Sequence, residues 1–312
     1  MSTAFRHIAV CVDESDASRR ALAEARRLRT FGEGRLTVLH VVQWPPPFAT
    51  GYGLQDTLAD LAGLGPSFAS VTYGALGSTR DRTRDLVIGM NADHPFPTMA
   101  HLTCVGHTRA EIAQLLDDYA AAGVTNILAL GGDPPADGRP PEGDFTYAIE
   151  LVEVVRAHPA GFSVGVAAHP ELHPRSTDRA EDRRHLADKL ALADFAITQF
   201  FFRAEDYARM LDELAALGCH RPVIAGVMPI ISAAGVRRMA DMNNTRIPPE
   251  LSARLDRVAD DPAAVAALGV ETAAALSEEL VAGGAPGLHL YSLNRATSVR
   301  RLWTPVTSAV RG

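Results

Sequence analysis

The 312-residue chain has few cysteines, few aromatic side chains and no long uninterrupted apolar run. Its three cysteines, Cys11, Cys104 and Cys219, lie far apart without the spacing of a metal site. We therefore expect small buried thiols in a reducing compartment and predict no metal. The apolar runs have the length of strands, which excludes a membrane-spanning helix. The N-terminus lacks the charged start and long apolar core of a secretory signal, so a cytoplasmic location is expected.

The chain also lacks basic blocks, and its formal net charge is -7. This acidity argues against nucleic acid or an anionic membrane as the main partner. A hydrophobic content of 47% over 312 residues is enough for the core of one large α/β domain.

Short apolar runs alternate with segments that carry apolar residues at helical spacing. This pattern is typical of parallel strands covered by helices. We predict strands at residues 36–42, 68–73, 99–104, 126–130, 162–168, 195–201, 223–228 and 288–292. Helices are expected at 54–64, 80–92, 108–122, 145–157, 179–192, 203–217 and 231–241, and across 248–282. Eight such units favour an α/β TIM (βα)8 barrel, for which about 250 residues are typical.

One further strand and helix precede these units, at residues 8–12 and about 17–29. The first 45–50 residues resemble the start of the universal stress protein family, whose first strand ends in an aspartate like Asp13 and whose second ends in a run such as His40-Val41-Val42. We therefore expect residues 1–34 to be a strand–helix extension of a barrel domain at 35–312. The glycine-rich phosphate loop of that family has no counterpart here, so the segment alone predicts no nucleotide site.

Function in a barrel is concentrated at the carboxyl ends of the strands. Those ends carry neutral donors and acceptors, histidines and a carboxylate, among them Gln43, Thr72, His101, Asp133, His169, His173, Gln199 and Tyr291. The set suits a polar heteroaromatic ligand better than hydrolysis, because no Ser–His–Asp order or dominant carboxylate pair stands out. His169 and His173 have the spacing of metal ligands on a helix, but Pro170 and Pro174 predict a loop.

Six motifs at these strand ends resemble the methylenetetrahydrofolate reductase family, from about residue 54 to residue 295. They are Ser-Val-Thr-Tyr-Gly at 70–74, His-Leu-Thr-Cys at 101–104, Ala-Leu-Gly-Gly-Asp-Pro at 129–134, Ala-Ala-His-Pro-Glu-Leu-His-Pro at 167–174, Ile-Thr-Gln-Phe-Phe-Phe at 197–202 and Tyr-Ser-Leu-Asn-Arg at 291–295. The resemblance implies a flavin-dependent TIM barrel and a possible homo-oligomer. It implies hydride transfer from NADH or NADPH to FAD, and then to 5,10-methylenetetrahydrofolate.

The resemblance also implies a set of site residues. Gln199 would hydrogen-bond the pterin, and Tyr291 and Arg295 would contact the folate substrate. Asp133 would lie beside flavin and folate, where a carboxylate can stabilise a cationic iminium form of the substrate. The implied FAD contacts are Thr72, His101, Leu130, Asp133, Tyr147, Ala148, His173, Asp182 and Lys189.

Two departures from the family pattern bear on catalysis. The glutamate that acts as general acid in the family is matched by Gln43, which has no proton to donate. Loss of a positioned acid costs roughly 10²–10⁴-fold in rate. Gly131 replaces an arginine that contacts the flavin in the family. Two alternatives follow from these departures: a flavin-free reductase, or a folate- or nucleotide-binding protein without catalytic activity.

Overall fold

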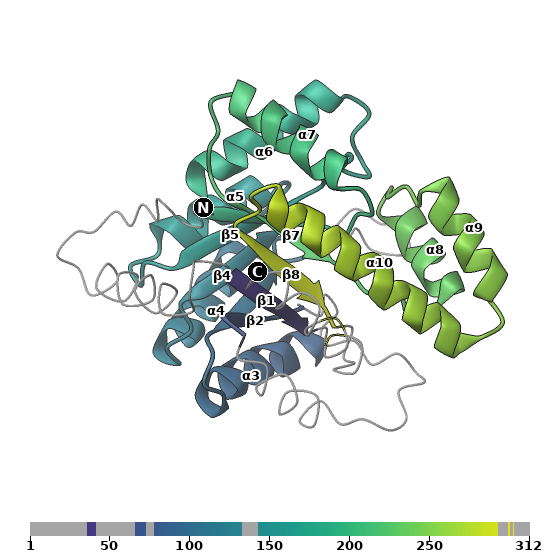
Figure 1. Ribbon diagram of the computed structural model, residues 1–312. Coiled ribbons are helices and arrows are strands. Elements are labelled where there is room, and N and C mark those ends of the chain that lie inside the picture. The colour runs from purple at the N-terminus through teal and green to yellow at the C-terminus, as the bar shows by residue number, and fades with distance from the viewer. Residues whose placement is uncertain are drawn as a thin grey trace.

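A closed ring of parallel strands forms the centre of the molecule (Figure 1). The computed structural model describes residues 36–41, 66–72, 78–132 and 143–292, together with Val299 and Leu302. Within these residues eight strands pair in chain order, and the first also pairs with the last. The strands are β1 (Leu36–Val41), β2 (Phe68–Val71), β3 (Thr98–Thr103), β4 (Asn126–Leu130), β5 (Ser163–Ala168), β6 (Phe195–Thr198), β7 (Val223–Val227) and β8 (Gly287–Tyr291).

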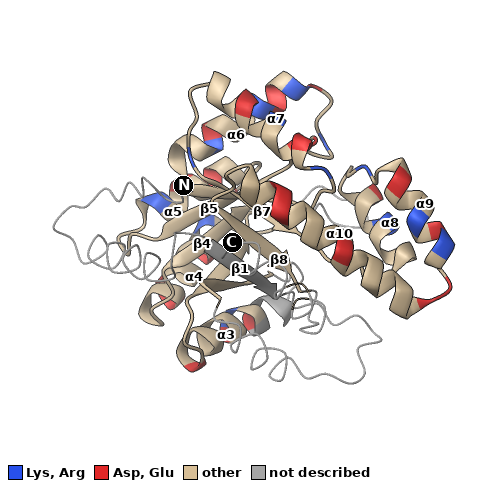
Figure 2. Ribbon diagram, viewed as in Figure 1, with Lys and Arg blue, Asp and Glu red and all other residues tan. Residues whose placement is uncertain are grey.

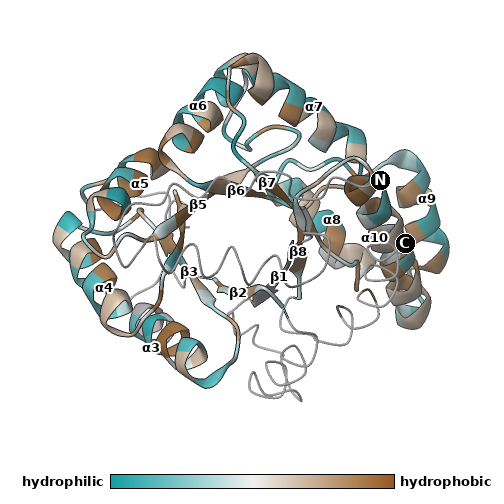
Figure 3. Cartoon of the chain, turned by 60° about the vertical axis from the view of Figure 1, so that its left-hand side comes forward, coloured by the Kyte–Doolittle hydropathy of each residue, from teal (hydrophilic) through white to brown (hydrophobic). Residues whose placement is uncertain are grey.

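Helices surround the ring on its outside (Figure 3). Those described are α3 (Ser78–Asp93), α4 (Arg109–Ala121), α5 (Ala148–Ala157), α6 (Arg179–Leu192), α7 (Ala204–Ala216), α8 (Ala233–Met242), α9 (Pro249–Val258) and α10 (Pro262–Ala282). Short polar side chains begin several of them. Thr108 starts α4 with a capping box, and Asp178, Ser232 and Asp261 each accept a backbone N–H in the first turn of their helix. These caps satisfy N–H groups that have no partner inside the helix.

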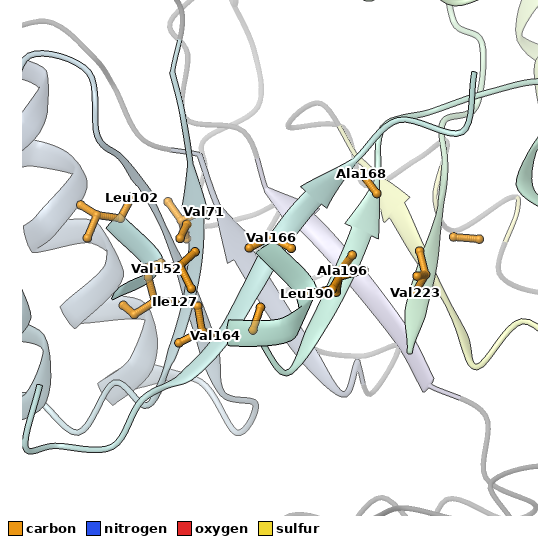
Figure 4. Packing of buried hydrophobic residues seen from close by; sticks show 14 of the residues in the cluster. Val71, Leu102, Ile127, Val152, Val164, Val166, Ala168, Leu190, Ala196 and Val223 are labelled. Atoms are coloured by element: carbon orange, nitrogen blue, oxygen red, sulfur yellow. The ribbon is translucent and has the colours of Figure 1, made fainter. Parts of the chain in front are cut away.

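Alternate residues of β2 to β8 face the helices. Val71, Leu102, Ile127, Val166 and other outward side chains are buried with apolar residues of the helices, such as Val152 and Leu190 (Figure 4). The described strands contain no Lys, Arg, Asp or Glu, and charged residues lie mainly on the helices (Figure 2). Burial of this apolar surface is the main source of stability.

The residues that face the barrel interior form a separate apolar cluster near the amino ends of the strands. It contains Phe68, Met99, Leu128, Ile197 and Ile224. Gly165 makes room for it, because a Cβ there would lie 2.6 Å from the ring of Phe195. This apolar layer fills the interior there, so the polar groups of the interior stand nearer the carboxyl ends.

A third cluster lies under α8, α9 and α10, beside the ring in Figure 1. Phe200, Met228, Ile230, Leu255 and neighbouring residues form it. Here α10 approaches the backbone closely, since a Cβ on Gly269 would lie 1.9 Å from the carbonyl oxygen of Ile230. Only glycine permits this approach. The cluster fixes α8 beside the carboxyl end of β6.

The predicted α/β class with a curved parallel sheet is confirmed, and each of the eight predicted strands has a counterpart. Among the predicted strands the largest boundary error is in the sixth. The sixth strand ends at Thr198, because Phe200 N–H donates to the side chain of Gln199 instead of a neighbouring strand. Helix was predicted across 248–282 without a division, and the structure has two helices there, since Asp261 caps a new helix that begins at Pro262.

Some sequence predictions fall outside the described residues. These are the strand and helix of the stress-protein-like segment and the helix at 54–64. Cys11 lies there as well. Cys104 is buried, as expected, but Cys219 is only partly buried.

Candidate functional site

Polar side chains form a second layer inside the barrel, which we call the polar layer. It lies nearer the carboxyl ends of the strands than the apolar layer does. Ser70 Oγ lies 3.1 Å from Nε2 of His289. The ring of His289 meets that of Tyr291 edge to face at 4.8 Å, and the Tyr291 hydroxyl donates to the carbonyl of Thr198 at 2.8 Å. This polar layer joins β2, β6 and β8 across the barrel.

The polar layer is electrically neutral near pH 7. Burial lowers the pKa of His101 to about 3. Burial, with the nearby His101, also lowers the pKa of His289 well below its usual value. Burial raises the pKa of Tyr291 above its usual range. The layer therefore consists of uncharged hydrogen-bonding groups, and an uncharged layer suits a polar ring better than a phosphate.

Gly226 is needed for this arrangement. A Cβ there would lie 2.2 Å from the carbonyl oxygen of Thr198 and 2.9 Å from the ring of Tyr291. The Gly226 N–H also donates to Thr198 Oγ1 at 2.7 Å. The absent side chain thus lets Tyr291 reach Thr198.

The loop after β5 and the following helix α6 bring together three residues for which the sequence predicts flavin contacts, His173 in the loop and Asp182 and Lys189 on the helix. His173 N–H donates to Asp182 Oδ1 at 3.3 Å, and Asp182 lies near enough to Lys189 to raise its pKa. The rings of His169 and His173 meet edge to face at 4.7 Å. These contacts place His173, Asp182 and Lys189 at one side of the barrel mouth.

Two arginines of α6 hold the backbone of this loop. Arg183, whose side chain is 2% exposed, donates to the carbonyls of residues 169–171 and pairs with Asp182 at 2.6 Å. Arg179 donates to the carbonyl of Glu171 at 2.6 Å. Both guanidinium groups pair with Glu213 of α7 at 2.7 Å. This network of α6 and α7 side chains holds the loop backbone and so positions His169 and His173.

Lys189 places a desolvated ammonium group beside the end of β5. Its Nζ donates to the carbonyl of Ala167 at 3.1 Å. Burial lowers the pKa of Lys189 to about 8, although Asp182 opposes the shift. The group is therefore largely protonated at pH 7 and loses its charge easily. Its charge also contributes to lowering the pKa of His169 to about 3, mainly a result of burial.

A second cation lies beside Gly131, which directly follows β4. The Arg175 Nη2 atom lies 3.6 Å from the place where a Cβ of Gly131 would be. Among the described residues the Arg175 guanidinium makes no hydrogen bond or ion pair, and the side chain is exposed. A guanidinium therefore stands at this strand end although the strand itself lacks an arginine.

Gln199 lies at the end of β6 beside a small cleft. The cleft is lined by residues that include His169, Glu171, Gln199, Asn243 and Thr245. Glu171 accepts the backbone N–H of Arg246 at 2.9 Å, which ties the loop after α8 to the loop after β5. Burial raises the pKa of Glu171, and its bonds to Arg246 oppose that shift.

The other predicted contacts lie at strand and helix ends. Thr72 directly follows β2, and Leu130 is the last residue of β4 and packs on the apolar layer. Tyr147 precedes α5, which begins at Ala148, and its side chain is 67% exposed. An exposed aromatic ring at this position is available for stacking on a ligand.

Three predicted site residues, Gln43, Asp133 and Arg295, lie outside the described residues. Sequence reasoning missed Ser70, Arg183 and His289. His289 could have been found, because it lies two residues before Tyr291 in an apolar strand and shares its face. Arg183 carried no signal, since its partners come from another helix and from loop carbonyls.

Within the part of the chain that the structure describes, no group of three His, Cys, Asp or Glu residues could hold a metal ion. The described helices also include none long and apolar enough to cross a membrane.

Comparison with known proteins gives a family for this site. The family model described as "Methylenetetrahydrofolate reductase" matches residues 43–306. The chain belongs to this family. It is 33% identical over 285 residues to the 5,10-methylenetetrahydrofolate reductase of Escherichia coli K12, covering 91% of this chain and 92% of that one. It is 32% identical to a plant relative from Arabidopsis thaliana, "Methylenetetrahydrofolate reductase (NADH) 1", of which the match covers 48%.

A solved structure shows a similar fold at low identity. A Clostridium thermocellum protein, described as binding two copies of 5-methyl-5,6,7,8-tetrahydrofolic acid, aligns with a TM-score of 0.56 at 13% identity, over 89% of this chain and 97% of that one. The predicted membership in the methylenetetrahydrofolate reductase family is confirmed. The family match begins at residue 43, so the resemblance of the N-terminal segment to universal stress proteins stays a prediction.

Proposed function

We propose that this chain reduces 5,10-methylenetetrahydrofolate to 5-methyltetrahydrofolate with NADH or NADPH, and that bound FAD carries the hydride between them. One observation supports this most: a neutral polar layer and the cations Lys189 and Arg175 lie at the same end of a barrel of this family. A neutral layer beside cations matches a ligand with a polar ring at one end and a diphosphate at the other.

The residues present fit FAD by the chemistry of their donors. Lys189 and Arg175, whose guanidinium lies beside Gly131, would bind the diphosphate oxygens. His101, Thr72 and Leu130 would border the ring system, and His173, Asp182, Tyr147 and Ala148 would line the rest of the path. Arg175 would restore the cation that Gly131 removes from β4.

The folate would be held by residues on the other side of the mouth. The Gln199 amide can donate and accept, which matches the paired donor and acceptor on a pterin edge. Asp133 would stabilise the cationic iminium form of the substrate, and Tyr291 and Arg295 would contact the remaining substrate groups. Each role is a proposal from the family motifs and from the position of the residue at a strand end.

We further propose a complete (βα)8 barrel at residues 35–312, in a cytoplasmic and oligomeric enzyme, with residues 1–34 as an addition outside the barrel. Deletion of residues 1–34 tests this division. If the truncated chain keeps the urea midpoint of the full chain, the segment is separate from the barrel. A large loss of stability would make it part of the fold.

Spectroscopy of the purified protein under anaerobic conditions tests the function. The flavin spectrum should bleach when NADH or NADPH is added and recover when 5,10-methylenetetrahydrofolate follows. Product analysis should show 5-methyltetrahydrofolate in an amount equal to the reduced flavin. The nicotinamide that bleaches the flavin faster identifies the donor.

The same experiment separates the alternatives. A protein that gains no flavin spectrum with added FAD, yet oxidises NADH when the folate is present, would be a flavin-free reductase. A protein that binds the folate without oxidising either nicotinamide would be a binding protein. Either result contradicts the proposed flavoenzyme.

The family's general acid is replaced by Gln43, two residues after the last residue of β1. We propose that this slows the folate half-reaction and leaves flavin reduction unchanged. Gln43→Glu should then raise the folate half-reaction by roughly 10²–10⁴-fold. Stopped-flow absorbance at the flavin band measures both steps. An unchanged rate in a folded Gln43→Glu variant would show that the proton has another source.

A further inference from the structure

The side-chain amide of Gln199 is held in one orientation by a short chain of hydrogen bonds. The backbone N–H of Phe200 donates to Gln199 Oε1 at 3.0 Å. Gln199 Nε2 donates to Asn243 Oδ1 at 3.0 Å. Asn243 Nδ2 in turn donates to the backbone carbonyl of Met239 at 2.9 Å.

The two ends of this chain remove the usual ambiguity between amide oxygen and nitrogen. A backbone N–H can only donate, so it requires the oxygen of Gln199. A backbone carbonyl can only accept, so it requires the nitrogen of Asn243. With Asn243 in this orientation, its oxygen faces Gln199 and selects the Gln199 nitrogen.

The chain leaves one side of Gln199 available. No other hydrogen bond reaches its side-chain amide among the described residues, so one Nε2 hydrogen and one Oε1 lone pair remain. Both residues line the same small cleft beside β6. Because the positions of this donor and this acceptor are fixed, the amide can bind a ligand edge whose acceptor and donor stand in the matching order. It binds an edge with the opposite order less well.

The end of α8 is itself fixed, which gives Asn243 a firm position. Asn243 ends α8, and the next residue, Asn244, has a positive φ of 53° that turns the chain away. The loop then returns to the barrel, where Arg246 N–H donates to Glu171 and Thr245 Oγ1 lies 3.4 Å from the carbonyl oxygen of Phe200.

We propose that Asn243 is a positioning residue that fixes the order of donor and acceptor on Gln199, and so sets the preference of the cleft for a pterin edge. This inference rests on the proposed function, since it assigns the ligand of Gln199. Asn243 itself acts through Gln199 and need not touch the substrate.

Two substitutions separate this role from a role in capping the helix. Asn243→Asp keeps an oxygen that accepts from Gln199 but loses the donor to Met239. Asn243→Ala loses both bonds. Equilibrium binding of 5-methyltetrahydrofolate, followed by protein fluorescence, should be weakened about tenfold in Asn243→Ala and less than about threefold in Asn243→Asp, since one hydrogen bond contributes on this order.

Three further measurements complete the test. The KM for 5,10-methylenetetrahydrofolate should follow the binding series, whereas NADH oxidation with menadione as acceptor should stay unchanged. Thermal unfolding should show both variants less stable, because both lose the bond to Met239. Asp241→Ala, an exposed position on α8, serves as the matched control.

The outcomes are distinct. Equal weakening in Asn243→Asp and Asn243→Ala would overturn the proposal, because the bond to the helix end would then be the cause. Unchanged binding in both folded variants would overturn it as well. If the wild-type protein binds no reduced folate, the proposed function fails before the variants are compared.

Discussion

The barrel interior has two layers with opposite chemistry, although the same strands build both. The lower layer is apolar and contains Met99, Ile197 and Ile224. Two residues after Met99 on β3 stands His101, in the polar layer, and two residues after Ile197 stands Gln199, just past the end of β6 at the barrel mouth. Successive residues of a strand alternate in direction, so a step of two keeps the same face.

This difference shows that the apolar layer, which stabilises the fold, lies directly beside the polar layer at the proposed ligand site. The apolar layer needs no partners beyond close packing. The polar layer and the loops around it need a hydrogen bond for each buried group. We therefore expect substitutions in the apolar layer to change stability but not ligand binding. Substitutions in the polar layer and in the loops around it should change stability, loop order or binding, according to the hydrogen bonds that they remove.

The largest effect should come from the network that holds the loop after β5. Arg183→Met leaves Glu213, Asp182 and three loop carbonyls without the buried guanidinium. The free energy of unfolding should fall by about 3–5 kcal/mol, as for other broken buried ion pairs. Urea denaturation measures this loss.

Arg184→Ala is the matched control, because Arg184 is the next residue of α6 and is exposed. Its effect should stay within about 0.5 kcal/mol. If Arg183→Met were equally mild, the loop would be held by other contacts.

An effect of intermediate size should appear in the pH dependence of FAD binding, through the titration of Lys189. Its pKa is lowered to about 8 in the folded protein, below the ordinary value of 10.5. Below pH 8 the ammonium is charged and can bind an anion, and above pH 8 this charge is lost. The dissociation constant for FAD should therefore rise above pH 8, by up to about tenfold per pH unit. Fluorescence titration of the apoprotein between pH 6.5 and 9.5 measures it.

The same shift has a consequence for folding. Between pH 8 and 10.5 the unfolded chain binds more protons at Lys189 than the folded protein, so this residue makes stability rise with pH in that window. Lys189→Arg stays charged throughout and should lose both pH dependences. A wild-type affinity for FAD that is flat across pH 8 would show that Lys189 does not face the anion.

The smallest effect should come from the apolar layer. Ile224→Val removes one buried methyl group and should lower the free energy of unfolding by about 0.5–1.5 kcal/mol. The dissociation constant for FAD should change less than about twofold. Urea denaturation and fluorescence titration check the two values. A large loss of affinity would mean that the two layers are coupled.

The strands and most helices could be predicted because their signals are local. The apolar run at residues 126–130 was predicted with the observed boundaries. The helix predicted at 203–217, whose apolar residues recur at helical spacing, is observed at Ala204–Ala216. The end of β6 could not be predicted, because it depends on a bond from Phe200 to a side chain.

The candidate site was accessible from sequence only where motifs marked it. His101, Lys189 and Gln199 came from the resemblance, and the structure places them at or near strand ends on the side of the polar layer. Arg175 and Asn243 had no such signal. The position of Arg175 depends on how the loop after β5 lies beside Gly131, and that of Asn243 on how α8 lies against β6. A contact between two segments that are far apart in the chain cannot be predicted from the sequence of either segment alone.

The most direct test of the account is one titration series with FAD, on the wild-type apoprotein and on the variants Lys189→Gln and Ile224→Val. The account predicts saturable binding to the wild-type protein and to Ile224→Val with similar dissociation constants. It predicts a dissociation constant about 10–100-fold higher for Lys189→Gln, the size expected for a lost charge-assisted hydrogen bond. Absent binding to the wild-type protein, or equal affinity in all three, would contradict it.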